Sequence, residues 1–484
     1  MGARAVAACG AASTGFLARL TMLDSLQNIL LLTDSYKVSH YRQYPPQTER
    51  VYSYFESRGG AYAEIVFFGL QYLLKRYLQG AVVTAARIDE AEALFARHFG
   101  DPNLFHRRGW EHILHQNAGR LPVSIRAVPE GTVVPFGNVL LTIENTDPAC
   151  WWLTNYLETL LVQSWYPTTV ATRTRAMKRT LLDALYKTGD PAGADFKLHD
   201  FGFRGVSSVE TAALGGAAHL VHFQGTDNLA GLVLAREIYA ADMPGFSIPA
   251  AEHSTLTCWG RAHEVDALRN MLRQFPTGIV AVVSDSYDLD HACREIWGRQ
   301  LRHEVLYRDG VLVVRPDSGD PPTIVVRVLE MLGTAFGFTH NSKGYKLLDS
   351  HVRLIQGDGI DAAMLAAVLN ATGQAGWSAD NIAFGSGGGL LQQVNRDACQ
   401  FAFKCSAAVV AGQERDVFKA PATDLRKSSK PGRLKLIVRQ GALATVRAQD
   451  HPDAADQLQE VFRDGELLAE TTFDAVRARA VIGG

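Results

Sequence analysis

One unit is repeated along the middle of this chain: a short apolar run, a cluster of polar and glycine residues, and then a stretch with helical character. The runs with their polar ends are residues 196–205, 220–227, 246–254, 279–288, 311–320, 352–359 and 382–389. Regular alternation of buried strands and helices is typical of a parallel α/β core. Seven such units predict a βα barrel, in which the chemistry lies on the loops that follow the strands.

The rest of the chain has a different character. Residues 121–146 have the Pro and Gly punctuation of β-hairpins, and residues 400–412 resemble a strand. Because 484 residues exceed one ordinary hydrophobic core, we expect several domains. The predicted division is a disordered extension at 1–25, an outer α+β domain from 26–165 plus 395–484, and a catalytic βα-barrel domain at 166–394.

Composition excludes several classes of protein. A formal net charge of -2 gives no bulk attraction to nucleic acid or acidic membranes, and the apolar residues are too evenly spread for a membrane protein. The six cysteines include no CxxC pair, which indicates a reducing compartment. We therefore expect a cytoplasmic metabolic enzyme with no nucleic-acid or membrane partner.

The first 21 residues are rich in Ala, Gly and Ser, contain Arg4 and Arg19, and lack acidic residues, which gives a faint likeness to a transit or signal peptide. Their apolar content is too broken for a signal-peptide core or a membrane span. We expect either a disordered extension or an upstream start codon, with the true start at Met22.

Two glycine-rich loops follow successive late strands, in VRLIQGDG and IAFGSGGG. Glycine lets backbone N–H groups approach an anion closely, and Gly387, Gly388 and Gly389 stand directly before a predicted helix start. Tight turns are the alternative interpretation. Two such loops on neighbouring strands favour a phosphate site, because barrels commonly bind phosphate there.

Carboxylates also follow the strands, at Asp285, Asp317 and Asp358. Such groups bind ribose hydroxyls or hold Mg²⁺ through water, and Arg315 adds a fixed cation beside them. The alternative is that the motifs SDSYD and RPDSGD cap the following helices, which would explain one aspartate in each motif. Capping does not explain an arginine at the end of a strand.

Histidines occur in three notable places. His253, in PAAEHST, lies at a predicted strand end and is a candidate nucleophile or general base. The pairs His112/His115 and His219/His222 have metal-like spacing but no adjacent third-ligand pattern such as HExxH, so we interpret them as structural.

A set of long motifs resembles the nicotinamide phosphoribosyltransferase family: LLTDSYKVSHYRQYPP, VYSYFESRG, LHDFGFRGVSS, GTDN, PAAEHST, SDSYD, RPDSGDP, QGDGID and FGSGGGLLQ. The resemblance runs from about Asn28 to the C-terminal helix and leaves out residues 1–25. It implies a type II phosphoribosyltransferase fold, an irregular βα barrel that works as a homodimer with shared active sites. The implied reaction joins nicotinamide to phosphoribosyl pyrophosphate, giving nicotinamide mononucleotide and pyrophosphate for NAD salvage, with Mg²⁺ and with ATP as co-substrate.

The resemblance also implies roles for the base-binding residues. Phe201 would form one face of a nicotinamide sandwich, and Tyr36 of the partner subunit the other. Asp227 would accept a hydrogen bond from the carboxamide, while Arg204 and Arg315 would flank the base and the phosphoribosyl group.

The same resemblance assigns the phosphate groups and the metal. Asp317 and Asp358 would hold the ribose and its Mg²⁺, no residue being assigned as a direct metal ligand, and His253 would be phosphorylated by ATP. Glu252 and Asp285 would orient the imidazole of that histidine. The 5′-phosphate would be bound by Gly357, Gly387 and Gly388, and pyrophosphate or ATP by Arg58, Arg396, Lys404 and Lys419, which the neighbouring subunit would supply. Ala402 departs from the family, which often has a serine there, so this position offers no hydroxyl to a phosphate.

Two other functions remain open from the sequence. Nicotinate phosphoribosyltransferase is the nearer one, but a carboxylate substrate needs a cation or hydroxyl where Asp227 stands. The other is a non-catalytic regulatory or extracellular binding protein on the same scaffold. The complete set of His253, Asp227 and phosphate glycines argues against lost catalysis.

Overall fold

The computed structural model describes residues 25–421, 423 and 428–482, so nearly all of the predicted N-terminal extension lies outside the described residues. The chain divides into two compact units. The first comprises Met1–Trp165 and Arg396–Thr471, and the second comprises Tyr166–Asn395 and Thr472–Gly484. The tail from Thr472 therefore belongs with the second unit, whereas the sequence-based division placed it in the outer domain.

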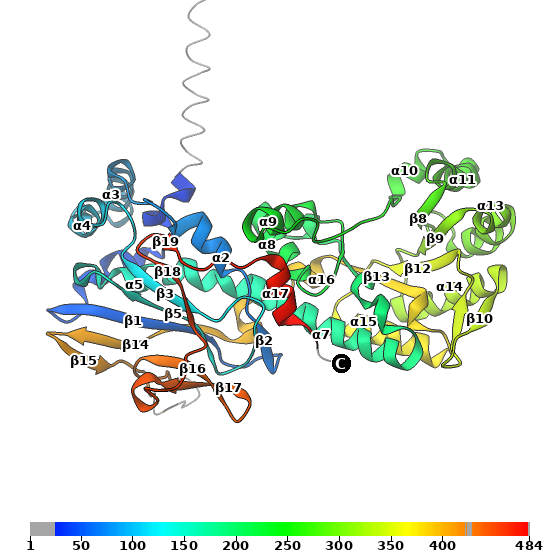
Figure 1. The fold of residues 1–484 in the computed structure, drawn as a ribbon. Helices are drawn as coiled ribbons and strands as arrows, with labels where there is room; N and C mark the ends of the chain where they lie inside the picture. The colour runs from blue at the N-terminus through cyan, green and yellow to red at the C-terminus, as the bar shows by residue number, and fades with distance from the viewer. Residues whose placement is uncertain (1–24, 422, 424–427, 483–484) are drawn as a thin grey trace, which may run out of the picture. The chain divides into compact units, whose positions relative to one another are not determined.

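The first unit is built on an antiparallel sheet of seven strands in the order β15-β14-β1-β5-β3-β18-β19. Its central strand β1 (Thr48–Ser57) pairs with β14 (Phe401–Val410) on one side and β5 (Val139–Asn145) on the other. N- and C-terminal segments thus share one sheet, visible as blue and orange arrows side by side (Figure 1). The other strands are β3 (Val123–Ala127), β15 (Gln413–Asp416), β18 (Gln459–Arg463) and β19 (Glu466–Leu467).

Helices and two small hairpins complete this unit. The hairpin partners are β2 (Glu64–Val66) with β4 (Val133–Pro135), and β16 (Leu434–Arg439) with β17 (Ala442–Arg447). The helices include η3 (Ser35–Arg42), α2 (Leu70–Leu73), α3 (Ala85–Phe99), α4 (Arg107–Gln116), α5 (Leu153–Tyr156) and α6 (Glu158–Leu161).

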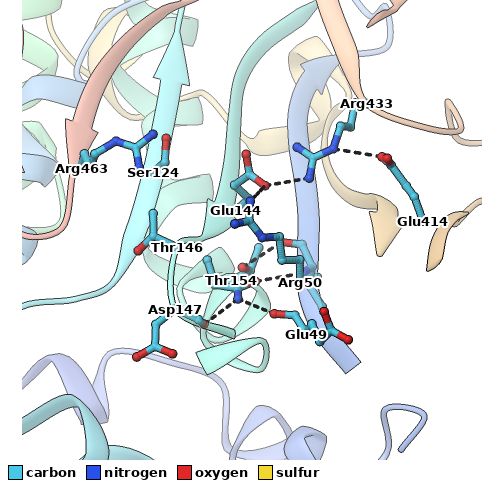
Figure 2. A network of polar contacts seen from close by, with 12 residues as sticks. Glu49, Arg50, Ser124, Glu144, Thr146, Asp147, Thr154, Glu414, Arg433 and Arg463 are labelled. Atoms are coloured by element: carbon cyan, nitrogen blue, oxygen red, sulfur yellow. Dashed lines mark hydrogen bonds and ion pairs between the residues drawn. The ribbon is translucent and has the colours of Figure 1, made fainter. Parts of the chain in front are cut away.

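Ion pairs attach the last hairpin to the large sheet. Arg433, just before β16, lies 2.9 Å from a carboxylate oxygen of Glu144 on β5 and 3.0 Å from one of Glu414 on β15 (Figure 2). Arg50 on β1 lies 3.6 Å from the same Glu144 carboxylate. These contacts join strands that are far apart in the sequence.

The second unit contains a parallel sheet in the order β7-β6-β13-β12-β9-β8. Its edge strands are linked through residues 246–250, by parallel bridges from Gly225 to Phe246 and from Ala250 to Ala281. The sheet therefore closes into the irregular βα barrel that the repeated unit predicted. The strands are β6 (Leu198–Asp200), β7 (Gly225–Thr226), β8 (Thr277–Val283), β9 (Asp309–Arg315), β12 (Val352–Gln356) and β13 (Ile382–Ser386).

Two of the predicted strands differ from expectation. The apolar run at residues 220–223 is a turn after α8 (Val209–His219), and the strand β7 begins only at Gly225. Residues 246–248 form no regular strand, and only Phe246 among them forms a bridge. The prediction of a strand at 220–223 was wrong because a short apolar run at the end of a buried helix has no periodicity that separates it from a strand.

Helices lie around the outside of this sheet (Figure 1). They are α7 (Trp165–Thr188), α8, α9 (Leu229–Tyr239), α10 (His253–Thr257), α11 (Glu264–Gln274), α13 (Arg302–Leu306), α14 (Pro321–Phe336), α15 (Ala362–Gln374) and α16 (Gly388–Leu391). Helices α8 and α9 pack closely: a Cβ on Gly231 would lie 2.7 Å from the carbonyl carbon of Gly216. No helix in the described part of the chain is long and apolar enough to cross a membrane.

The C-terminal helix α17 (Phe473–Ala480) is tied to the barrel by Arg477. Its guanidinium donates to the carbonyl oxygens of Leu220, Phe223 and Pro244, at 2.8, 3.3 and 2.6 Å. Two of these carbonyls belong to the turn between α8 and β7. The tail therefore supports the connection that leads into the Asp227 loop.

Candidate active site

The residues predicted for the second unit gather at the carboxyl ends of its strands. Two cavities there share Phe201, Arg204 and Arg315 in their walls. The strand ends also carry Asp227 after β7, His253 at the start of α10, and the carboxylates that follow β8, β9 and β12. The parallel direction of the strands places these loops at one mouth.

The first cavity has a volume of about 640 Å³ and combines flat apolar walls with one carboxylate. It is lined by Phe201, Phe203, Arg204, Val206, Ser207, Ser208, Val209, Asp227 and Arg315. The Arg315 guanidinium lies 5.5 Å from the centre of the Phe201 ring. Ser247 donates a hydrogen bond to the Asp227 carboxylate, which fixes its orientation. The cavity offers a ring face and a hydrogen-bond acceptor, which suits a planar aromatic amide.

The ring of Phe201 packs directly against Gly385. A Cβ at position 385 would lie 1.9 Å from one ring carbon of Phe201 and 2.2 Å from another. We predict that Gly385→Ala pushes the ring into the cavity and raises the KM for nicotinamide, the base that the sequence resemblance implies, by about tenfold, since overpacking costs about 1–3 kcal/mol. Steady-state kinetics with the base varied would measure this.

Gly373→Ala is the matched control for that substitution. Gly373 is a helical residue on α15, where an added Cβ would meet only Thr188 at an ordinary 3.7 Å. It should leave the KM unchanged. An equal KM in Gly385→Ala and wild type would show that the Phe201 ring does not contact the base.

The second cavity, of about 420 Å³, is polar and glycine-lined. Its walls include Gly357, Asp358, Gly359, Gly387, Gly388, Gly389, Arg204, Arg315 and Asp317. The two glycine loops are neighbours because β12 and β13 pair in parallel, with Gln356 opposite Phe384. Helix α16 is a single turn, so backbone N–H groups rather than a long helix would carry the attraction for an anion.

Arg173 on α7 holds the glycine loop from outside. Its guanidinium donates to the carbonyl oxygens of Gly389 and Gln393, at 2.5 and 2.8 Å. This contact was not predicted from the sequence, because nothing in the type or spacing of an arginine within a long helix indicates contact with a distant loop. Its effect is to fix the end of α16 and hence the loop before it.

His253 lies among carboxylates at the same mouth. Its Nε2 is 3.6 Å from Asp285 Oδ1 and 3.6 Å from Asp317 Oδ2, and its Nδ1 is 3.2 Å from the hydroxyl of Ser286. Glu252 is the residue before α10, and its carboxylate accepts a hydrogen bond from Ser254. The imidazole is half-exposed and oriented, which suits a group that reacts with a ligand.

The acidic residues of the site are not helix caps. The side chains that cap the following helices belong to Asp288, Asp320 and Asp361, a few residues further along each motif. Asp285 is instead buried, and its Oδ2 accepts from the Asp317 main chain at 3.1 Å and from the Ser318 hydroxyl at 2.5 Å. Asp317 Oδ1 accepts twice from Arg315, at 3.1 and 2.7 Å. Capping therefore accounts for one aspartate in each motif, Asp288 and Asp320, and not for Asp285 or Asp317.

The first unit carries the remaining predicted residues. Burial lowers the pKa of Lys404 on β14; the charge of Glu158 opposes this shift, and the charges of Arg58, Arg396 and Lys419 add to it. These four residues therefore form a cationic cluster within this unit, as expected for an anion site. Tyr36 lies on η3 of the same unit and is 59% exposed.

Glu56 orders part of this cationic cluster. This residue was not predicted from the sequence. Its carboxylate is 2% exposed, accepts from Arg58 Nε at 2.8 Å, and also pairs with Lys430. Residues 51–57 of β1 are all buried, and neither the type nor the spacing of these residues indicates that Glu56 pairs with basic side chains there. The pairing holds the Arg58 guanidinium in one orientation.

The histidine pairs take structural positions. His112 Nε2 lies 2.7 Å from Asp147 Oδ2, and Cys150 is close enough that all three ligand atoms fall within 4.8 Å. The sequence did not predict these two neighbours. The Asp147 carboxylate also accepts from Asn117 at 3.0 Å and from the Ala149 main chain at 2.9 Å, so its oxygens already serve a turn.

His219 and His222 are both buried in the second unit. His219 Nε2 lies 3.0 Å from the Gly225 carbonyl oxygen, and His222 Nδ1 lies 3.1 Å from the Thr174 hydroxyl. Burial lowers the pKa of His219 to about 3, so this ring is neutral at physiological pH. Each ring has its own protein partner, which fits a structural role.

Comparison with known proteins gives the family of the chain. The nicotinate phosphoribosyltransferase (NAPRTase) family matches residues 196–466, and the nicotinamide phosphoribosyltransferase N-terminal domain matches residues 28–125. A nicotinamide phosphoribosyltransferase of Xanthomonas campestris is 53% identical over 465 residues, which cover 94% of this chain and 98% of that relative. The chain belongs to the nicotinamide phosphoribosyltransferase family. It is accordingly a phosphoribosyltransferase enzyme, and the resemblance seen in the sequence is confirmed.

Solved structures of distant relatives share the fold of this family. The crystal structure of a nicotinate-nucleotide pyrophosphorylase from Pyrococcus furiosus has a TM-score of 0.57 at 16% identity and covers 94% of this chain and 95% of that chain. The human nicotinic acid phosphoribosyltransferase has a TM-score of 0.54 at 18% identity and covers 93% of each chain. These likenesses confirm the predicted α/β fold class.

Proposed function

We propose that this chain transfers the phosphoribosyl group of phosphoribosyl pyrophosphate to nicotinamide, giving nicotinamide mononucleotide and pyrophosphate, in cytoplasmic NAD salvage. The observation that carries this is the pairing of Phe201 and Asp227 in one cavity, in a chain whose relative of 53% identity is named for that activity. The ring nitrogen of nicotinamide would attack C1 of the ribose as the bond to pyrophosphate breaks.

Selection of the base follows from Asp227. Its carboxylate would accept a hydrogen bond from the carboxamide NH₂ while Phe201 stacks on the ring. Nicotinate would bring a second carboxylate to the same place, where like charges repel. The nicotinate alternative is therefore disfavoured.

The ribose and the metal would be held at the strand ends. Asp317 and Asp358 would hold Mg²⁺ through water or through substrate oxygens, and Gly357, Gly387 and Gly388 would bind the 5′-phosphate. The donor set fits: the Asp317 and Asp358 carboxylates offer hard oxygen atoms, and both residues line the polar cavity beside the glycine loops. Bound Mg²⁺ would neutralise charge on the leaving pyrophosphate.

ATP would act through His253. One imidazole nitrogen would attack the γ-phosphorus, the bond to ADP would break, and water would later release phosphate from the phosphohistidine. While present, the phosphate would add negative charge close to Asp285 and Asp317. This charge would change the affinity for pyrophosphate and Mg²⁺ and so drive synthesis.

We predict that His253→Ala abolishes ATP hydrolysis but leaves slow, ATP-independent synthesis, because the imidazole takes no part in the glycosidic step. Phosphate release and nicotinamide mononucleotide formation, measured separately, would show this. His263→Ala is the control, since His263 is an exposed residue near α10 that pairs with Asp266. Continued ATP hydrolysis by His253→Ala would place the phosphorylated group elsewhere.

The cationic cluster suggests a shared active site. Arg58, Arg396, Lys404 and Lys419 belong to the first unit, whereas the base and glycine cavities lie in the second. A homodimer with C₂ symmetry would bring this cluster and Tyr36 of the partner subunit to the barrel mouth. The cluster would then bind pyrophosphate or ATP.

The proposed reaction is tested by comparing nicotinamide and nicotinate as substrates, each with and without ATP. Nicotinamide should give its mononucleotide, faster with ATP, and nicotinate should react poorly. Equal use of both bases would contradict the role of Asp227. No product from either would favour the non-catalytic alternative.

A further inference from the structure

Asp200 lies at the end of β6, and its carboxyl group is fully buried. None of the binding and catalytic roles described above involves this residue. It directly precedes Phe201. Its Oδ1 accepts from the Gly202 main chain at 2.7 Å, and its Oδ2 accepts from Asn228 Nδ2 at 2.9 Å. Its own carbonyl oxygen accepts from the Asp227 main chain at 3.0 Å. One residue thus bonds to both turns that flank the base cavity.

Asn228 completes the link from the other side and is also fully buried. Its Oδ1 caps α9 by accepting from the Gly231 main chain at 3.3 Å, and its Nδ2 donates a second bond to the Ala212 carbonyl of α8 at 2.9 Å. The amide is therefore fully used, and the helix that starts behind Asp227 is joined to the strand that ends at Phe201.

Space around this link is tight. A Cβ on Gly202 would lie 3.0 Å from Asp200 Oδ1 and 2.7 Å from the Leu391 side chain. Close packing and intact hydrogen bonds together hold the turn at residues 200–202 in a single conformation. Loss of the link would let Phe201 and Asp227 shift relative to each other.

We propose that Asp200, through Asn228, is the positioning residue of the base cavity: its carboxylate locks the Phe201 turn to the Asp227 turn. This rests on the proposed function, because it assigns these two turns to nicotinamide. Asp200 touches neither base nor ribose and acts only through the residues beside it. Its two oxygens must both accept hydrogen bonds, so the carboxylate is the working form.

The titratable groups that face Asp200 in the described structure are Asp227, from the loop after β7, and Tyr166, from α7. Burial, together with the charge of Asp227, raises the pKa of Asp200 to about 6. The carboxylate therefore predominates above this pH and the protonated acid below it. Protonation turns one oxygen into a donor that would face an N–H group, so the lock should loosen as the pH falls below about 6.

The test compares Asp200→Asn and Asn228→Ala with wild type at pH 8. An amide has one acceptor oxygen, so Asn at position 200 keeps the bond from Gly202 or the bond from Asn228 but not both. The KM for nicotinamide should rise about tenfold in each variant, as expected for one lost bond to a charged group, while the KM for phosphoribosyl pyrophosphate stays within about twofold. Between pH 8 and 5.5 the nicotinamide KM should rise in wild type and stay flat in Asp200→Asn.

Asn381→Ala is the matched control. Asn381 is likewise fully buried and bonds to Lys346, Ser378 and Leu348, but it lies at the opposite end of β13 from the cavities. It should lower the melting temperature without changing either KM. An unchanged nicotinamide KM in folded Asp200→Asn, or an equal rise for both substrates, would overturn the proposal.

Calorimetric binding of nicotinamide separates this inference from the proposed reaction. A wild type that binds nicotinamide without converting it would contradict the proposed reaction. The positioning role of Asp200 would then still be tested by comparing the dissociation constants of nicotinamide for the same variants. A wild type that does not bind nicotinamide would contradict both.

Discussion

Asp227→Ser should change the ratio of kcat/KM for nicotinamide to kcat/KM for nicotinate by about 10³-fold, the largest effect we expect from a single substitution. Asp227 offers a carboxylate to the base cavity, positioned by Ser247 and by its main-chain bond to Asp200. A site built to pair a buried NH₂ strongly rejects a ligand without one. Serine removes the repulsive charge and supplies a hydroxyl that can donate to a carboxylate, so nicotinamide use falls and nicotinate use rises.

The ratio of kcat/KM for nicotinamide and nicotinate measures this change. Asp242→Ser is the control, because Asp242 is also an exposed aspartate of the second unit and lies outside both cavities. It should leave the ratio as in wild type. A ratio that is unchanged in Asp227→Ser would mean that the carboxamide is recognised elsewhere.

Mixed dimers of two inactive variants should recover about a quarter of wild-type activity. Asp227→Ala disables the base cavity, and Arg396→Ala disables the cationic cluster, so each homodimer should be nearly inactive. If the cluster is donated across a C₂ interface, both lesions in a mixed dimer fall in one active site and the second site is intact. Random exchange makes about half the dimers mixed, each with one working site, which gives the quarter.

Differently tagged variants, purified alone and after exchange, would provide the measurement. The control mixes two Asp227→Ala chains with different tags, where no site can recover. Absence of recovery after mixed dimers have been isolated would show that each active site is contained in one chain. The cluster would then serve the barrel of its own subunit.

The sequence predicted the architecture of the barrel because its signal is repeated. Each unit combines a buried run with polar residues at the strand end, and a repeated pattern outweighs local ambiguity. It failed at residues 220–223, where a helix end is as apolar as a strand, and at residues 246–250, which close the ring by bridges alone. Closure of this kind depends on tertiary contacts that have no local pattern.

Prediction of the site was also uneven. Asp285, Asp317 and Arg315 were found because charged residues at strand ends are unusual enough to notice, and the structure places them in contact. Asp200 and Gly385 lie in two other motifs of the family, LHDFGFRGVSS and FGSGGGLLQ, but were not found. Asp200 matters because of its buried hydrogen bonds, and Gly385 matters because the Phe201 ring occupies the space that a Cβ would fill. Neither property is visible in residue type or spacing.

Each unit of the fold combines early and late segments of the chain. The first sheet needs β14 to pair with β1, and the barrel receives Arg477 from a helix that begins at Phe473. During synthesis from the N-terminus, neither unit can complete its fold until its late segment has been made. A nascent chain paused after residue 395 therefore exposes an unpaired β1 edge on which strands of other chains can assemble.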